Sequence, residues 1–112
     1  MGGIDPIDFT KNSINICNQV EEVKGYDTQI IDNLVVKIRV YLIKDLFIDV
    51  FYNADTERVS YSLIKSQNRI FGVDNTGNWH THPFNEPVKH ISCSPLSFDA
   101  FIKLVLEEII KE

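Results

Sequence analysis

The residues best suited to chemistry in this chain are its three histidines, which lie in one short segment together with one of the two cysteines. His80 and His82 are separated by a single residue, so their side chains point to the same side of an extended segment. His90 and Cys93 follow within eleven residues of His82. Imidazole nitrogens and a thiolate sulfur are ligands that zinc prefers in a tetrahedral site. The segment therefore predicts a candidate zinc site formed by His80, His82, His90 and Cys93.

A second interpretation uses the histidines without a metal, because the spacing matches no common structural zinc pattern, which usually contains paired cysteines. Histidine exchanges a proton near neutral pH, and two histidines can act as general base and general acid in cleaving RNA through its 2′-hydroxyl. Lys89, beside His90, would stabilise the negative charge that develops on the phosphate. Three arginines would hold the RNA backbone if they share one face, although a solvated outer face explains them equally well: Arg39, Arg58 and Arg69.

The composition is that of a folded protein of one domain. The chain has 112 residues, of which 44% are hydrophobic and 24% charged, so it is long enough to bury a core. The net charge of −5 argues against an extended nucleic-acid surface, which carries an excess of basic residues, but not against a small basic groove. No secretory signal and no apolar stretch of membrane-spanning length are evident, so we expect a cytoplasmic protein with reduced cysteines and no membrane contact.

Hydrophobic periodicity predicts two helices around four strands. The first helix covers residues 6–24, with Asp5 as its N-cap and Gly25 at its end. Alternation of apolar and polar residues predicts strands at 36–42, 46–52, 58–65 and 69–73. A long loop with no clear period follows over residues 79–93. The last helix has Ser94 as its N-cap, and its apolar stripe consists of Phe98, Phe101, Ile102, Val105 and Ile109.

The connections between the predicted strands are short, which favours an antiparallel meander over parallel crossovers. The fold class that we predict for residues 1–112 is a single α+β domain, an antiparallel sheet of about four strands with an N-terminal and a C-terminal helix packed on one face. On the opposite face we expect aromatic residues, with Trp79 as a further binding residue: Tyr41, Phe47, Phe51 and Phe71. Exposed patches of this kind mark interfaces, so a homodimer and a non-catalytic interaction domain are further predictions.

Several short features follow one another along residues 35–109: an alternating hairpin, a strand with Tyr61, a strand ending in Asp74-Asn75, a loop with His82-Pro83, and Lys89-His90. In these features and their order the chain resembles the TumE-like family of small toxin–antitoxin proteins. The resemblance implies a toxin that acts on RNA or translation and is neutralised by a cognate antitoxin. It also implies the catalytic candidates Asp74, Asn75, His82, Lys89 and His90. The chain departs from the family at residues 86–88, where more histidines are common, and at residues 72–73, where a basic and an aromatic residue are common.

A second resemblance covers the five residues from Trp79 to Pro83, which look like the zinc signature of the JAMM/MPN+ isopeptidases. In that family a serine follows the histidine pair, and an aspartate ligand follows three residues after the serine. Here Leu96 stands three residues before Asp99, so the pattern is incomplete. This resemblance implies a metal-dependent hydrolase, which stays an alternative to a toxin-type ribonuclease.

Overall fold

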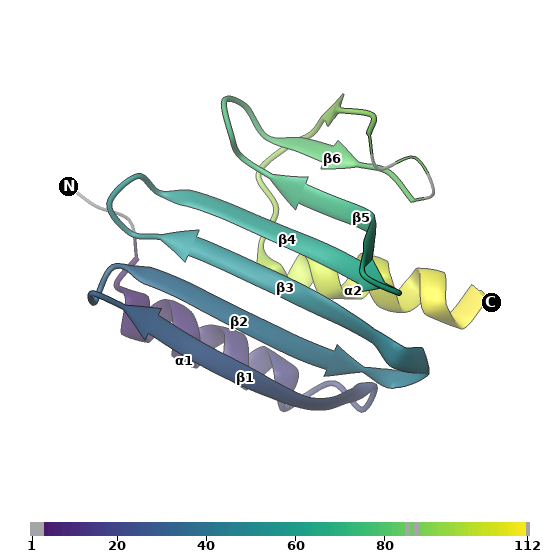
Figure 1. Ribbon diagram of the computed structural model, residues 1–112, viewed down its shortest axis with the longest axis horizontal. Coiled ribbons are helices and arrows are strands. Elements are labelled where there is room, and N and C mark those ends of the chain that lie inside the picture. The colour runs from purple at the N-terminus through teal and green to yellow at the C-terminus, as the bar shows by residue number, and fades with distance from the viewer. Residues whose placement is uncertain (1–3, 85, 87, 112) are drawn as a thin grey trace.

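Seven antiparallel strands, paired in chain order, form one sheet, and both helices cover the same face of it (Figure 1). The computed structural model describes residues 4–84, 86 and 88–111. The helices are α1 (Pro6–Cys17) and α2 (Phe98–Lys111), and a 3-10 turn, η1 (Ile43–Asp45), joins the second and third strands. The strands are β1 (Val23–Ile31), β2 (Val35–Leu42), β3 (Leu46–Asn53), β4 (Arg58–Lys65), β5 (Asn68–Asp74), β6 (His80–His82) and β7 (Ile91–Ser92).

The prediction of about four strands is wrong, because three of the seven strands carry no clear alternation. β1 is an edge strand whose side chains are half-buried or exposed throughout, so its sequence shows no period of two. β6 has three residues and β7 has two, which is too short for a repeating pattern to be recognised. The four predicted strands correspond to β2–β5, and the α+β class, the antiparallel order and the two terminal helices are confirmed.

The first helix is shorter than the predicted range 6–24 and ends at Cys17. Its predicted N-cap is confirmed, since the Asp5 carboxylate accepts a hydrogen bond of 2.8 Å from the N–H of Ile7. The fully buried positions of this helix are small residues at helical spacing: Pro6, Thr10, Ser13 and Cys17. Phe9 and Ile16 are half-buried and pack against the core beside them. The Thr10 and Ser13 hydroxyls donate to backbone carbonyls one turn earlier, so both can be buried without losing a hydrogen-bond partner.

The last helix begins later than predicted. α2 starts at Phe98, and its N-cap is Ser97 rather than Ser94, because the Ser97 hydroxyl accepts a hydrogen bond of 3.2 Å from the N–H of Ala100. The predicted apolar stripe is confirmed, since all five of its residues are buried. Phe101 is fully buried, and its ring centroid lies 5.3 Å from that of Phe71 and 5.2 Å from that of Tyr61. This aromatic group is the centre of the contact between α2 and the sheet.

A β-bulge in β5 decides which of its side chains face the open side of the sheet. Leu63 pairs with Phe71, but the next residue, Ile64, pairs with Arg69, so Ile70 has no partner in the register. The bulge reverses the alternation, so Arg69 is turned outward while Phe71 is buried in the core. The prediction that Phe71 belongs to an outer aromatic patch is therefore wrong.

On the open face, residues that lie opposite one another in the register form two rows across the strands. The Phe51 row consists of Gln29, Lys37, Phe51, Ser60, Asp74, His80 and Ser92. The Arg39 row consists of Asp27, Arg39, Asp49, Ser62, Gly72 and His82. Tyr41 and Phe47 pair with each other beside the Arg39 row. Opposite residues share a face of an antiparallel sheet, so the histidines of β6 lie on the same face as Phe51 and Arg39.

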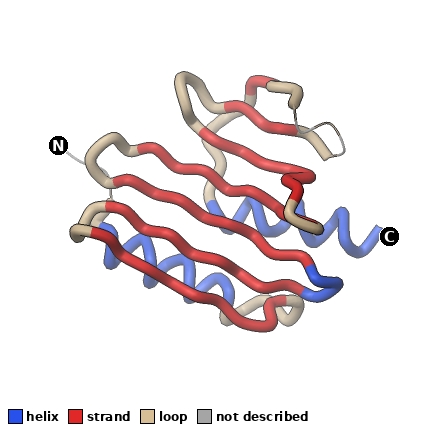
Figure 2. Tube along the Cα trace, viewed as in Figure 1, coloured by secondary structure: helices blue, strands red, loops and turns tan. Residues whose placement is uncertain are grey.

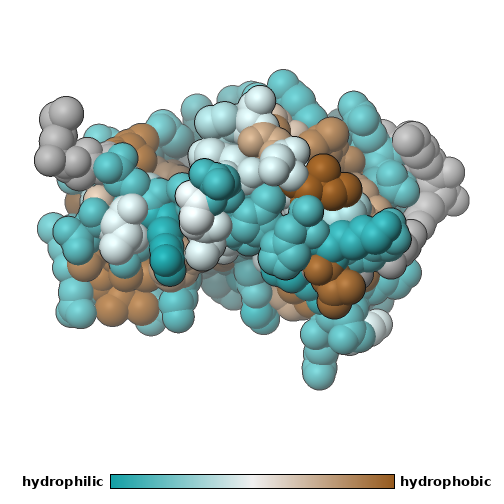
Figure 3. Space-filling model, turned by 90° about the horizontal axis from the view of Figure 1, so that it is seen from above, coloured by the Kyte–Doolittle hydropathy of each residue, from teal (hydrophilic) through white to brown (hydrophobic). Residues whose placement is uncertain are grey.

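The end of the sheet at β6 and β7 is mostly hydrophilic, with hydrophobic residues in small groups (Figure 3). Val88, just before β7, and Ile91, within it, are 85% and 52% exposed, so neither contributes to the core. Among the described residues, no helix combines the length and apolar character needed to cross a membrane.

Candidate active site

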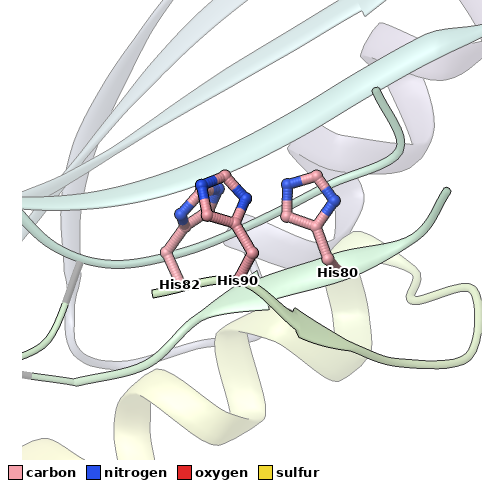
Figure 4. Close-up of side chains that lie close together, drawn as sticks. All are labelled: His80, His82 and His90. Atoms are coloured by element: carbon pink, nitrogen blue, oxygen red, sulfur yellow. The ribbon is translucent and has the colours of Figure 1, made fainter. Parts of the chain in front are cut away.

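The three histidines gather at one point on the open face of the sheet (Figure 4). His80 and His82 project from the same side of β6, and His90, in the segment that leads into β7, adds the third ring. One ring nitrogen of each histidine lies within 4.8 Å of the other two, and the ring centroids are 4.9, 4.8 and 4.5 Å apart. The expected proximity of the three rings is confirmed.

Asp74, at the end of β5, connects two of the histidines through its carboxylate. Its Oδ1 lies 3.2 Å from Nε2 of His80, and its Oδ2 lies 3.0 Å from Nε2 of His82. Oδ1 also accepts a hydrogen bond of 3.0 Å from the N–H of Thr76. Burial alone would raise the pKa of Asp74, but hydrogen bonds from the Thr76 N–H and the His82 ring, together with the electrostatic influence of His80, lower that pKa. The carboxylate is therefore held in its charged form.

His82 is the buried member of the cluster, with 4% of its surface exposed. Its Nδ1 lies 3.3 Å from a guanidinium nitrogen of Arg69, which can only donate, so Nδ1 is the acceptor. The proton of the neutral ring is then on Nε2, where it is donated to Asp74. The two charged neighbours thus fix both the tautomer and the orientation of this ring.

Arg69 reaches His82 because position 72 is a glycine. A Cβ at Gly72 would lie 3.1 Å from Cδ of Arg69 and 3.2 Å from the carbonyl oxygen of Tyr61. The missing side chain therefore leaves room for the Arg69 stem to lie along β5, on the face to which the bulge at Ile70 has turned it.

We expect Gly72→Ala to lower the free energy of unfolding by about 1 kcal/mol, since crowding of a packed site typically costs about 1–3 kcal/mol. It should also push Arg69 away from His82 and shift the ¹⁵N resonance of His82 Nδ1. Denaturant unfolding and ¹⁵N spectroscopy measure the two effects. Gly25→Ala is the matched control, because a Cβ there meets no atom within 4 Å. An unchanged stability together with unchanged His82 resonances would contradict this role of Gly72.

Both ring nitrogens of His80 face oxygen atoms. Nδ1 lies 2.8 Å from the carbonyl oxygen of Asn78, and Nε2 faces the Asp74 carboxylate. A neutral imidazole carries one N–H and can satisfy only one of these acceptors. A proton on Nδ1 satisfies the Asn78 carbonyl, and a second proton, on Nε2, would face the Asp74 carboxylate.

His90 is the exposed member of the cluster. Its ring lies against the rings of His80 and His82, but it forms no hydrogen bond with any residue that the structure describes. A nitrogen of this ring is consequently open to accept a proton from a bound molecule.

The contacts of Arg69, His82, Asp74 and His80 form one continuous polar chain that ends at the carbonyl of Asn78. In this polar chain every donor faces an acceptor, and no buried side-chain nitrogen or oxygen in the described part of the protein lacks a hydrogen-bond partner. Fully satisfied polar networks of this kind hold their members in one arrangement.

The fourth candidate zinc ligand, Cys93, lies outside the cluster. Its N–H donates a hydrogen bond of 3.1 Å to the carbonyl of Trp79, and its half-buried side chain packs against the hydrophobic core. Burial and, second, the charge of Asp74 raise the pKa of its thiol. The structure thus brings together three of the four residues, the histidines.

Both cysteines should react slowly with thiol reagents in the folded protein. Burial raises the pKa of Cys17 to about 11, and this residue is only 3% exposed, so the reactive thiolate is scarce and shielded. At pH 8 we expect one slow reaction, that of Cys93, with an aromatic disulfide reagent, and reaction of Cys17 only after unfolding. Two thiols that react at the rate of free cysteine would contradict these positions.

Two further catalytic candidates have other partners. Oδ1 of Asn75 accepts a hydrogen bond from the N–H of Val59, and its Nδ2 donates one to the carbonyl of Glu57. Both hydrogen bonds are 2.9 Å long. Asn75 therefore ties the end of β5 to the start of β4. Lys89 is exposed and forms an ion pair of 2.9 Å with Glu86, beside the cluster rather than within it.

The binding candidates are divided in the same way. Arg69 belongs to the polar chain, whereas Arg39 forms two hydrogen bonds with Asp49, of 2.9 and 3.1 Å, farther along the open face. Trp79 is half-buried and packs against the core. Sequence reasoning missed the role of Gly72, which depends on the bulge and has no signal of its own. It also missed Ser60 and Ser62, which alternation with Tyr61 places on the open face.

The site therefore offers the His80 ring beside the Asp74 carboxylate and, next to it, the open ring of His90, an arrangement suited to moving protons on a bound substrate. Comparison of the chain with protein-family models, with curated proteins and with solved structures finds no match.

Proposed function

We propose that this chain is a toxin-type ribonuclease, similar to the TumE-like family, that cleaves RNA by acid–base catalysis through the 2′-hydroxyl. The observation that carries the proposal is the polar chain next to an open ring: His80 faces two acceptors, and His90, 4.8 Å away between ring centroids, has no hydrogen-bond partner among the described residues. Such a reaction requires a proton acceptor within reach of the 2′-oxygen and a proton donor within reach of the 5′-oxygen of one phosphodiester.

In this reaction His90 takes the proton of the 2′-hydroxyl, and His80 gives a proton to the leaving 5′-oxygen. A bond forms between the 2′-oxygen and phosphorus while the bond from phosphorus to the 5′-oxygen breaks. The products are a 2′,3′-cyclic phosphate and a free 5′-hydroxyl. Asp74 stabilises the charged form of His80, and His82 and Arg69 hold Asp74 in place, so these three are positioning residues.

The resemblance to the TumE-like family adds support. Three of the five catalytic candidates that it implies, Asp74, His82 and His90, lie together, although the first and last are sixteen residues apart. The positive charges of Arg69 and His80 favour a phosphate at this point in a chain whose net charge is −5. A cognate antitoxin and a homodimer are further expectations of this proposal.

The direct test compares single-stranded RNA of random sequence with the same pool made of 2′-deoxynucleotides. We expect the purified protein to cut the RNA and to leave the deoxy pool intact, because the attacking hydroxyl is then missing. Intact RNA, or equal cleavage of both pools, would contradict the proposal.

A second candidate function is that of a metal-dependent hydrolase, which the convergence of three imidazole nitrogens within 4.8 Å favours. Nε2 of His80 and Oδ1 of Asp74 are 3.2 Å apart, close to the separation of about 3.3 Å between ligands of a tetrahedral zinc ion. Nδ1 of His80 bonds a backbone carbonyl, as in metal-binding histidines. A bound zinc ion would supply a water activated for hydrolysis. We rank this candidate second, because His82 could bind a metal only by giving up its hydrogen bond to Asp74 or to Arg69.

The two candidates differ in their response to chelation. EDTA leaves acid–base cleavage unchanged but removes an activity that needs a metal. Zinc added to chelator-treated protein should raise the melting temperature only if the histidine cluster binds it, since a ligand of the folded state stabilises that state. A zinc-induced rise that His90→Ala abolishes, with activity lost in EDTA, would favour the hydrolase.

A further inference from the structure

The open face of the sheet carries a groove beside the histidine cluster that the proton transfers do not use. The groove encloses about 600 Å³ and crosses the four strands from β1 to β4. Both helices lie on the other face, so none covers it (Figure 2). Side chains of both rows line it, among them Lys37, Phe51, Ser60 and Ser62.

The strand register joins this groove to the histidine cluster. In the Phe51 row, Ser60 lies opposite Asp74, and Asp74 lies opposite His80. Neighbouring strands are about 4.8 Å apart, so Phe51 is about 14 Å, or three strand steps, from His80. In the Arg39 row, Ser62 is opposite Gly72, and the Arg69 stem lies over Gly72 between the groove and His82. A molecule that reacts at the cluster can therefore extend into the groove along one face.

The charges that line the groove balance one another. The two cations of the lining, Lys37 and Arg39, are matched in number by Asp27 and Asp49. Arg39 is bound to Asp49 through two hydrogen bonds. Phosphate recognition needs an excess of positive charge, which this lining lacks. The groove therefore suits an uncharged group, whereas the histidine cluster includes the cation Arg69, which lies beside His82.

Polar partners also interrupt the aromatic surface expected on this face. The guanidinium of Arg39 lies 4.2 Å above the ring centroid of Phe47, and the hydroxyl of Tyr41 donates a hydrogen bond of 2.8 Å to Asp27. Phe51, in contrast, lines the groove itself. This mixture of one flat ring with hydroxyl and amide groups fits a planar polar ligand better than the apolar centre of a protein interface.

We propose that the groove binds an unpaired base of the single-stranded RNA whose phosphodiester is held at the histidine cluster. The inference deepens the proposed ribonuclease function and rests on it. The base stacks on Phe51, and its polar edge exchanges hydrogen bonds with Gln29, Ser60 and Ser62, whose side chains both donate and accept. Stacking on an aromatic ring combined with hydrogen bonds to a base edge is the usual way in which proteins recognise unpaired RNA.

Fluorescence anisotropy with a labelled single-stranded RNA whose 2′-hydroxyls are methylated tests this, because the probe binds without being cut. Phe51→Ala should weaken binding roughly tenfold, a loss typical of one stacked base. Phe51→Leu keeps most of the volume and should weaken binding similarly, which separates stacking from a folding defect. Tyr41→Ala is the matched control, an aromatic residue on the same face outside the groove, and should bind like the wild type.

The outcomes separate the groove from the catalytic proposal. Phe51-dependent binding supports the groove even if unmethylated RNA is not cut, a result that would contradict the catalytic proposal alone. If the wild type cleaves RNA but both Phe51 variants bind the methylated RNA as tightly as the wild type does, only the proposal that the groove binds a base would be overturned. Absence of RNA binding, or light scattering that shows a Phe51-dependent dimer in its place, would also overturn it.

Discussion

Replacement of His90 by alanine is expected to slow RNA cleavage by at least about 100-fold while the fold stays intact, because general acid–base groups contribute about 10²–10⁴-fold. His90 is exposed and has no hydrogen bond to a described residue, so removal of its ring leaves no buried group unpaired. His80→Ala should have a comparable effect, since it removes the group that donates the proton. Initial cleavage rates measure both losses, and thermal unfolding shows that each variant is folded.

The control for His90 is its neighbour Ile91, which is 52% exposed and contributes no proton-transfer group. Ile91→Ala should cleave RNA at the wild-type rate. A His90→Ala protein that retains full activity would exclude His90 as the base. An equal loss in Ile91→Ala would show that the segment before β7, rather than the imidazole, determines the rate.

Phe101→Ala should have the largest effect on stability, a loss of about 3–5 kcal/mol in the free energy of unfolding. The ring is fully buried between α2 and the sheet, where it lies against Phe71 and Tyr61, so its removal leaves a cavity lined by rings that cannot close it. Domains of this size are stable by only about 5–15 kcal/mol. The melting temperature should therefore fall by at least about 10 °C.

Leu104 supplies the control on the same helix. It is 39% exposed, whereas Phe101 is fully buried, so Leu104→Ala removes less buried surface from a smaller side chain and should change stability less. Calorimetry or chemical denaturation measures both variants. Equal losses in the two would contradict the assignment of the core to the face of α2 that carries Phe101.

The central part of the fold could be predicted from the sequence because the sheet is buried on one side only. Val36 and Ile38 face the helices, while Lys37 and Arg39 face the open side, and this contrast produces the alternation by which β2 was recognised. β1 could not be recognised in this way, since it lies at the edge of the sheet. The strands that carry or adjoin the histidines are too short to show any period.

The site could be predicted in part for a similar reason. The spacing of His80 and His82 placed both rings on one side, and the structure agrees. The position of His90 beside the other two rings depends on the pairing of β7 with β6, which no local sequence pattern indicates. The contact between Arg69 and His82 depends on a bulge that shifts the alternation of β5 by one residue. The sequence does not show this bulge, and for the same reason it predicts the wrong face of the sheet for Phe71.

The chemical identity of the ends that the protein leaves on RNA in the presence of EDTA tests the central claim most directly. Mass spectrometry of the products distinguishes a 2′,3′-cyclic phosphate from the ends left by direct attack of water. The acid–base account predicts a 2′,3′-cyclic phosphate and a free 5′-hydroxyl, formed at the same rate with and without the chelator. Cleavage that stops in EDTA, or products that never pass through the cyclic phosphate, would contradict it.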